Sequence, residues 1–137
     1  MHLRHSRLFA LSAVTGVVAL FAALPAFAAP VKTAGTTVKV TISSANEFKF
    51  KLSTSKVKHG TVTFKVTNNG LLPHDFKVCS SNKGGTANTC AGKSTAQITP
   101  PQTATLTVNL SKPGKYEYLC TFPGHAQQGM KGVLTVT

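Results

Sequence analysis

The sequence predicts an all-β fold, a Greek-key antiparallel β-sandwich of about seven or eight strands. Three observations support this prediction. Apolar and polar residues alternate with a period of two in several segments, clusters of turn-forming residues separate these segments, and no convincing run of helical period occurs outside the amino-terminal apolar stretch. Alternation of this kind is typical of strands with one buried and one solvated face, which a two-sheet sandwich packs against each other.

Three segments show the alternation most clearly: residues 38–42, 61–67 and 103–110. In each, aliphatic or phenylalanine side chains occupy one face, and threonine, lysine or asparagine the other, so we expect the apolar face to point inward. A further strand carries Tyr116 and Tyr118 on one face and ends near Cys120. Turn signals separate the strands at residues 58–60, 68–70, 83–85 and 112–114.

The segment 80–101 departs from this pattern. It is rich in serine, threonine, asparagine and glycine with little apolar content, and we interpret it as a long surface excursion. Cys79 and Cys90 bracket half of it, and we expect them to form a disulfide, which in the chain-entropy model contributes roughly 3 kcal/mol for a loop of this size. The alternative is a redox-active dithiol, but such a pair favours a closer spacing of the Cys-x-x-Cys type.

Residues 1–28 have the features of a secretory signal peptide. Arg4 and Arg7 precede an uncharged, mostly apolar run over 8–24, and Ala26-Phe27-Ala28 supplies small residues at the positions that a signal peptidase recognises. We expect cleavage after Ala28 and a single mature domain of residues 29–137 in a periplasm or a Gram-positive exterior, where disulfides form. The alternative for an apolar run of this length is a single membrane anchor.

The expected mature chain is strongly basic. Thirteen lysines face only Glu47, Asp75 and Glu117, which leaves a formal charge of +10 on residues 29–137. The lysines are spread singly along the strands, and this part contains no arginine, the usual reader of phosphates and base edges. The charge pattern therefore argues against a nucleic-acid partner and favours steered encounters with acidic proteins.

Four residues carry metal-ligand chemistry. Cys120, His125 and Met130 recur at intervals of five on what we expect to be one loop between two strands, and His74 stands at the mouth of another strand. One thiolate, two imidazoles and one thioether form the ligand set of a blue, or type 1, copper site. Taken singly, the cysteine and the methionine fit core packing and each histidine fits a solvated loop, as we expect for His59. The spacing and the separate His74 segment together favour copper.

The resemblance of these motifs to a known family supports the same interpretation. The Gly60–Phe64 strand, Asn68-Asn69-Gly70 and the Cys-Thr-Phe-Pro-Gly-His stretch resemble cupredoxins, the type 1 copper family that includes plastocyanin, pseudoazurin, azurin and auracyanin. The resemblance covers essentially the whole mature chain and implies one copper ion with the ligands His74, Cys120, His125 and, axially, Met130. Asp75 is a departure, because many relatives have asparagine there. Its carboxylate accepts hydrogen bonds from Thr121 but cannot donate one to a carbonyl.

Together with the expected signal peptide, the resemblance predicts a soluble exported one-electron carrier between redox proteins. We expect no catalytic activity, and a monomer is the default expectation. It also implies an apolar patch around His125 that docks on a partner with an acidic face, such as a cytochrome or a membrane redox complex. We expect the patch to consist of Leu71, Leu72, Pro73, Phe122, Pro123 and Ala126.

Three other classes of function fit the sequence less well. A copper enzyme needs a second copper centre with several more histidines, which His59 alone cannot build. A copper carrier or storage protein is the main alternative, although carriers favour exchangeable clusters of methionine or histidine and residues 29–137 contain a single methionine. A metal-free binding domain is disfavoured because all four ligands are present.

Overall fold

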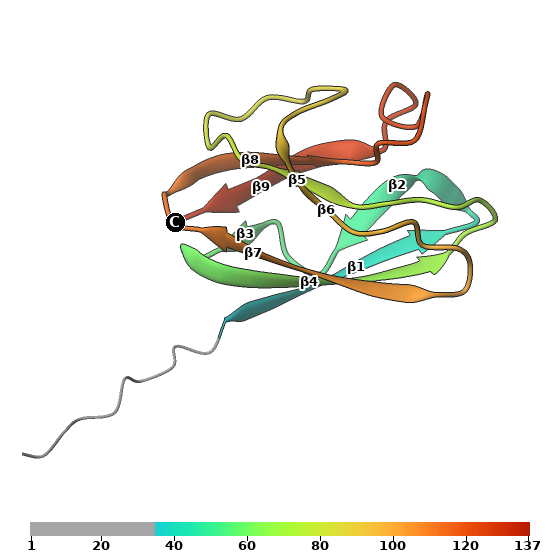
Figure 1. Cartoon of the computed structure of the whole chain (residues 1–137), viewed down its shortest axis with the longest axis horizontal. Coiled ribbons are helices and arrows are strands. Elements are labelled where there is room, and N and C mark those ends of the chain that lie inside the picture. Colours follow the sequence, from blue (N-terminus) through green and yellow to red (C-terminus); the bar gives the residue numbers. More distant parts are fainter. Residues whose placement is uncertain (1–34) are drawn as a thin grey trace, which may run out of the picture. The chain divides into compact units, whose positions relative to one another are not determined.

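The computed structural model describes residues 35–137, so the expected signal peptide and its cleavage point after Ala28 lie outside the described residues. The described part forms nine strands in two facing sheets (Figure 1). The strands are β1 (Thr36–Ser43), β2 (Asn46–Leu52), β3 (Lys56–Val57), β4 (Gly60–Asn69), β5 (Lys77–Cys79), β6 (Gly92–Ser94), β7 (Thr103–Leu110), β8 (Gly114–Leu119) and β9 (Lys131–Val136). Within residues 35–137, no helix has the length and apolar character needed to cross a membrane.

The strand order is β2-β1-β4-β7 in one sheet and β3-β9-β8-β5-β6 in the other. The predicted all-β sandwich is confirmed, but two neighbouring pairs, β1 with β4 and β3 with β9, are parallel where we expected antiparallel pairing. The chain leaves the first sheet after β2, forms β3 in the second sheet and returns as β4 beside β1, so no hairpin fixes their direction. The count exceeds the expected seven or eight because β3 and β6 are too short to show an alternating pattern.

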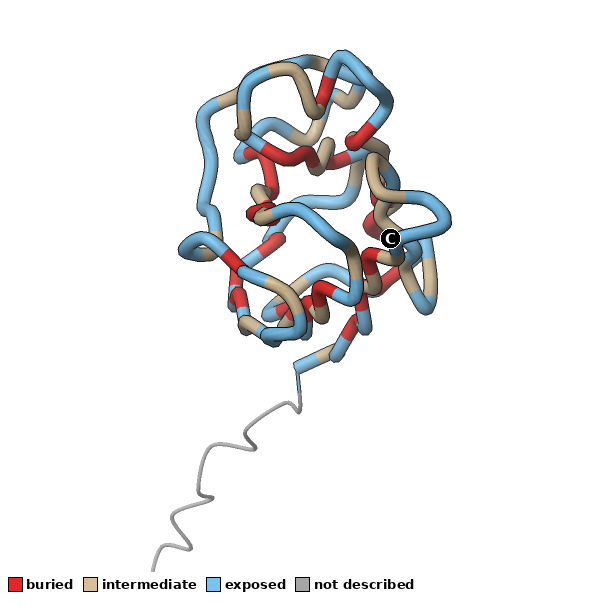
Figure 2. The backbone as a smooth tube through the Cα atoms, turned by 90° about the vertical axis from the view of Figure 1, so that its right-hand side faces the viewer, coloured by how far each residue is buried: buried red, intermediate tan, exposed pale blue. Residues whose placement is uncertain are grey.

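The three alternating segments lie within β1, β4 and β7, and their apolar residues point into the space between the sheets. Val62, Phe64 and Val66 of β4 are fully buried, and Val38, Val40 and Ile42 of β1 are at most 1% exposed. Along each strand, buried positions alternate with exposed or intermediate ones (Figure 2). Fully burying a valine or phenylalanine side chain contributes roughly 1.5–3 kcal/mol, so these three strands supply much of the core.

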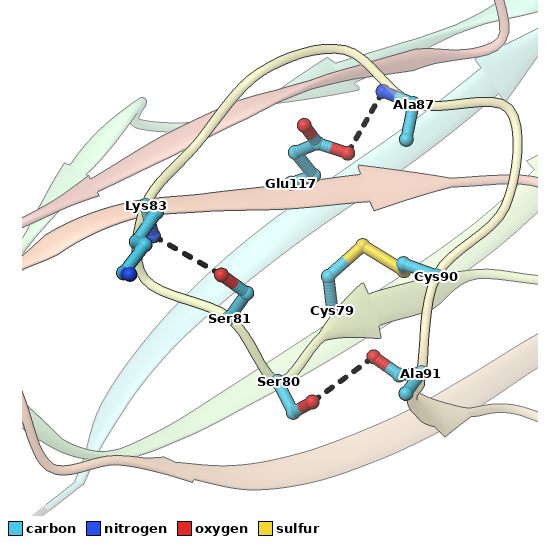
Figure 3. Close-up of a disulfide and its surroundings, with 8 residues drawn as sticks. All are labelled: Cys79, Ser80, Ser81, Lys83, Ala87, Cys90, Ala91 and Glu117. Atoms are coloured by element: carbon cyan, nitrogen blue, oxygen red, sulfur yellow. Dashed lines mark hydrogen bonds between the residues drawn. A yellow bond between two sulfur atoms is a disulfide. The ribbon is translucent and has the colours of Figure 1, made fainter.

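The polar segment 80–101 contacts the sandwich in several places. Cys79 and Cys90 form the predicted disulfide, with their Cα atoms 5.6 Å apart (Figure 3). The Ala87 amide donates a hydrogen bond to the Glu117 carboxylate at 2.8 Å. The segment is not irregular throughout, because β6 pairs with β5 and Ile98, which is 1% exposed, pairs with His74. Its second half is therefore tied to the sandwich by backbone pairing and by the buried Ile98, although most of its residues are exposed.

The strand directions bring the candidate ligands to one end of the sandwich. The parallel register of β1 with β4 pairs Ser43 with Asn69, so the β1–β2 turn lies beside the segment that follows β4. The antiparallel pair β8–β9 matches Leu119 with Lys131, which closes the intervening loop at the same end, opposite the carboxyl terminus (Figure 1). The β1–β2 turn, the segment after β4 and the β8–β9 loop thus lie together at one end of the sandwich.

Candidate metal centre

Three of the four predicted ligands converge on one point. The Nδ1 atoms of His74 and His125 lie 3.1 Å apart, and the Cys120 Sγ lies 3.5 Å from the His125 Nδ1 and 3.9 Å from the His74 Nδ1. A bound metal such as zinc lies about 2.0–2.1 Å from an imidazole nitrogen and about 2.3 Å from a thiolate, so donors that share one ion lie at most about 4.4 Å apart. The three separations fit a single ion.

Met130, the fourth predicted ligand, is fully buried and belongs to the same core cluster as Cys120. The Cys120 amide donates to the Met130 carbonyl, and the Met130 amide donates to the His125 carbonyl, each at 3.0 Å. Gly124 and Gly129 adopt φ angles of +82° and +105°, which favour glycine. They allow the loop to reverse just before His125 and again just before Met130. The main chain thus holds Met130 beside Cys120.

The ligands differ in their exposure. His74 is fully buried and Cys120 is 1% exposed, whereas His125 is only partly buried. Phe122 stacks on the His125 ring at a centroid distance of 5.5 Å, and Phe48 meets it edge-on at 5.1 Å. Of the two histidines at the site, His125 is therefore the closer to solvent, and two aromatic rings hold its orientation.

Burial controls the protonation of the metal-free site. Removal from water raises the pKa of the Cys120 thiol to about 12, although the amides of Asp75 and Phe122 favour the thiolate. The pKa of His125 is lowered, first by burial and then by the neighbouring His74. At neutral pH the thiol therefore carries its proton and the His125 imidazole is neutral, so a metal that binds Cys120 must displace one proton.

Asp75 ties the two ligand loops together. Its carboxylate accepts a hydrogen bond from the Thr121 amide at 2.6 Å, a second from the Thr121 hydroxyl and a third from the Ser94 hydroxyl at 3.0 Å. The sequence prediction that this carboxylate accepts hydrogen bonds from Thr121 is confirmed. Since Asp75 directly follows His74 and Thr121 directly follows Cys120, the bonds fix the spacing of two ligands.

Glu47 is a site residue that the sequence analysis missed. Its Oε1 atom lies 2.7 Å from the His74 Nε2, and its carboxylate also accepts hydrogen bonds from the amides of Leu71 and Leu72. Burial raises the pKa of Glu47, but these hydrogen bonds outweigh it, so the pKa lies below its ordinary value. Two features of the sequence could have drawn attention to Glu47. It is one of only three acidic residues in the chain, and it directly precedes an alternating apolar strand that starts at Phe48.

The remaining histidine of the described part lies elsewhere. His59 is exposed, and its Nδ1 lies 3.1 Å from the carbonyl of Thr137 at the opposite end of the sandwich. Among residues 35–137, His74, Cys120 and His125 are the only group of three or more histidine, cysteine or acidic side chains placed to hold one ion.

Comparison with known proteins decides the family. Residues 36–137 match the family model described as copper binding proteins, plastocyanin/azurin family. The chain belongs to this family. The match spans every described strand, and it confirms the cupredoxin resemblance and the assignment of copper as the metal.

Several members of the family and of its fold are similar to this copper-binding chain. Auracyanin-B of Chloroflexus aurantiacus is 49% identical over 43 residues, which are 31% of this chain and 18% of that protein, so the match spans a small part of the relative's length. The structure of dithionite-reduced auracyanin from Roseiflexus castenholzii has 28% identity and a TM-score of 0.56, covering 76% of this chain and 98% of that one.

The fold also occurs within larger proteins. A multicopper oxidase from Pediococcus acidilactici is 18% identical with a TM-score of 0.51, and the match covers 85% of this chain but 29% of the oxidase. At this level of identity the likeness concerns the fold alone.

Proposed function

We propose that the protein is a soluble exported one-electron carrier and not an enzyme. In this proposal His74, Cys120, His125 and Met130 would hold one type 1 copper ion, which would carry one electron by changing between Cu(I) and Cu(II). The observation that carries the proposal is a buried donor set, brought together by two loops, in which a single histidine approaches the surface. Bound copper supplies one-electron redox chemistry, since thiolate and thioether favour Cu(I) and imidazole suits both oxidation states.

The chain's own contribution is a site that moves little. Hydrogen bonds donated by the Thr121 amide and hydroxyl to the Asp75 carboxylate join the two ligand loops, and the bond from the Cys120 amide to the Met130 carbonyl closes the longer loop. The aromatic rings of Phe48 and Phe122 fix His125. Donor groups held in this way keep one arrangement in both oxidation states, which favours rapid electron transfer.

An apolar surface beside the site supports docking of a redox partner. Leu71 and Leu72, at 77% and 41% exposure, are the large hydrophobic side chains that the described part leaves exposed, and both lie in the segment that leads to His74. Pro123 is also exposed. Ala126 differs from the expectation for this patch, because it is only 1% exposed and packs with Leu119 inside the molecule.

The charge distribution supports an acidic partner. All three carboxylates are engaged internally, Glu47 by His74, Asp75 by Thr121 and Glu117 by Ala87. Within residues 35–137 the one basic side chain in close contact with a carboxylate is His74, beside Glu47, so no described lysine is paired with a carboxylate. An uncompensated positive surface accelerates encounters with a negatively charged protein in a salt-dependent way.

The proposal is tested by the visible absorption and EPR spectra of the protein with one equivalent of Cu(II), followed by voltammetry. We expect an intense blue thiolate charge-transfer band, a narrow copper hyperfine splitting and reversible one-electron reduction. A pale, ordinary cupric spectrum would show that Cys120 is not a ligand and would refute the electron-carrier proposal. Retention of copper against a weak chelator separates an electron carrier from a copper carrier, because a copper carrier exchanges its metal within seconds.

A further inference from the structure

We propose that Glu47 is a positioning residue of the metal centre: its carboxylate holds His74 with the proton on Nε2 and the free nitrogen toward the metal, and its negative charge favours the oxidised centre. The second part of this inference rests on the proposed copper function. The first part concerns the protein with or without metal.

The geometry of the contact fixes which His74 nitrogen carries the proton. An ionised carboxylate only accepts hydrogen bonds, so the 2.7 Å contact with Glu47 places the proton on the His74 Nε2. In a neutral imidazole the other nitrogen, Nδ1, then has its lone pair free. This nitrogen faces Cys120 and His125, so the contact with Glu47 prepares His74 for metal binding.

The structure is built around this carboxylate. Gly70 leaves the space that the carboxylate occupies, because a Cβ atom added at this position would collide with both Glu47 oxygens. Its backbone is not in the left-handed region, so nothing else in its conformation requires glycine. The amides of Leu71 and Leu72 complete the cradle by donating to the same carboxylate. Glu47, at the start of β2, thus links the backbone amides of the exposed Leu71 and Leu72 to the buried His74.

The negative charge of Glu47 affects the reduction potential of the bound copper, whereas its hydrogen bond affects the orientation of His74. A negative charge that is hydrogen-bonded to a metal-bound imidazole makes the imidazole a stronger electron donor and attracts Cu(II) more strongly than Cu(I). The variant Glu47→Gln keeps the size and the acceptor oxygen but removes the charge, whereas Glu47→Ala removes both. Comparison of the two separates the electrostatic contribution from the positioning.

The first experiment measures the reduction potential and the Cu(II) affinity of the loaded protein. We expect a higher potential in both Glu47 variants and an affinity about 10–100-fold weaker in Glu47→Ala. Glu117→Gln is the matched control, since it removes the same charge from a carboxylate that binds the excursion (Figure 3). A potential that shifts no further in Glu47→Gln than in Glu117→Gln would overturn the electrostatic part.

The second experiment uses the metal-free protein, so its result does not depend on the proposed function. Nitrogen-15 NMR of His74 at about pH 8 distinguishes the two neutral tautomers by their ring shifts. We expect the Nε2-protonated form in the wild type and in Glu47→Gln, and a mixture in Glu47→Ala. A mixture in the wild type, or no change in Glu47→Ala, would overturn the positioning part.

Gly70→Ala offers an independent perturbation that leaves Glu47 in the sequence. The added methyl group displaces the carboxylate, so this variant should reproduce the His74 tautomer mixture of Glu47→Ala. In the Glu47→Ala background the same substitution should have no further effect, because the collision has been removed. Additive effects of the two substitutions would contradict the proposed contact.

If the wild type gives no blue band, the electron-carrier proposal fails, while the tautomer measurement still decides the role of Glu47.

Discussion

The elevated pKa of Cys120 predicts that copper binding releases a proton. Removal of the thiol from water raises its pKa to about 12, so the metal-free protein keeps Cys120 protonated throughout the physiological range. Only the thiolate is a metal ligand, so Cu(II) must displace this proton. The perturbation that reveals the effect is a change in pH, and the contribution of the thiol is isolated by the substitution Cys120→Ala.

The size of the effect follows from the position of the pKa. Below about pH 12 each increase of one pH unit lowers the cost of forming the thiolate by about 1.4 kcal/mol, which is a factor of ten in affinity. Between pH 7 and 9 Cys120 alone should therefore tighten Cu(II) binding about 100-fold. His125 adds little to the proton count in this range, because its pKa is lowered and its imidazole is already neutral.

Calorimetry in two buffers of different ionisation enthalpy counts the released protons. We expect one more proton per Cu(II) in the wild type than in Cys120→Ala. Met130→Leu is the matched control, because it removes a predicted ligand that carries no dissociable proton and should leave the count unchanged. An equal count in the wild type and Cys120→Ala would refute the prediction, since the thiol would then be ionised before binding or would not bind the metal.

Four further predictions concern stability and encounter with a partner. Thr121→Val removes the hydroxyl that donates to Asp75 and should lower the free energy of unfolding by about 1–3 kcal/mol in denaturant titrations; an unchanged midpoint would show that the bond adds nothing. Replacing Cys79 and Cys90 by alanine should lower the free energy of unfolding by roughly 3 kcal/mol and leave the blue absorption band in place. Loss of the band would mean that the disulfide supports the metal centre. The metal-free protein should lose about 1.4 kcal/mol of stability per pH unit between about pH 9 and 11, because the unfolded Cys120 thiol ionises there and the folded one does not; Cys120→Ala should lack this loss. Finally, electron exchange with an acidic redox protein should slow as ionic strength rises from 0.01 to 0.15 M, about the range over which the Debye length falls from 30 to 8 Å, and a rate independent of salt would refute electrostatic steering.

Most strands and three of the four candidate ligands could be recognised in the sequence because their signals are local. Alternation with a period of two in residues 61–67 needs only the knowledge that one face of β4 is buried. Cys120, His125 and Met130 lie close together in the chain, so their spacing is visible without a structure. The structure brings His74, Cys120 and His125 together as the sequence predicted.

The features that were missed depend on contacts between distant segments. The parallel pairing of β1 with β4 leaves no mark in either strand, since an alternating pattern is the same for both directions of the neighbour. Glu47 and His74 are separated by 27 positions, and their contact depends on the register that places the β1–β2 turn beside the end of β4. Ile98 lies in a polar segment whose composition suggests a surface loop, yet its main chain pairs with His74.

The internal use of all three carboxylates has a consequence for how identical molecules meet. Glu47, Asp75 and Glu117 are hydrogen-bonded by groups of the same chain, and no described lysine is paired with a carboxylate, so positive charge strongly predominates on the surface. Two copies must approach against mutual repulsion before their His125 rings come close, and at low salt this repulsion acts over tens of ångströms. In the proposed electron-carrier function, we therefore expect slow electron exchange between like molecules in dilute salt and faster exchange with a partner of opposite charge.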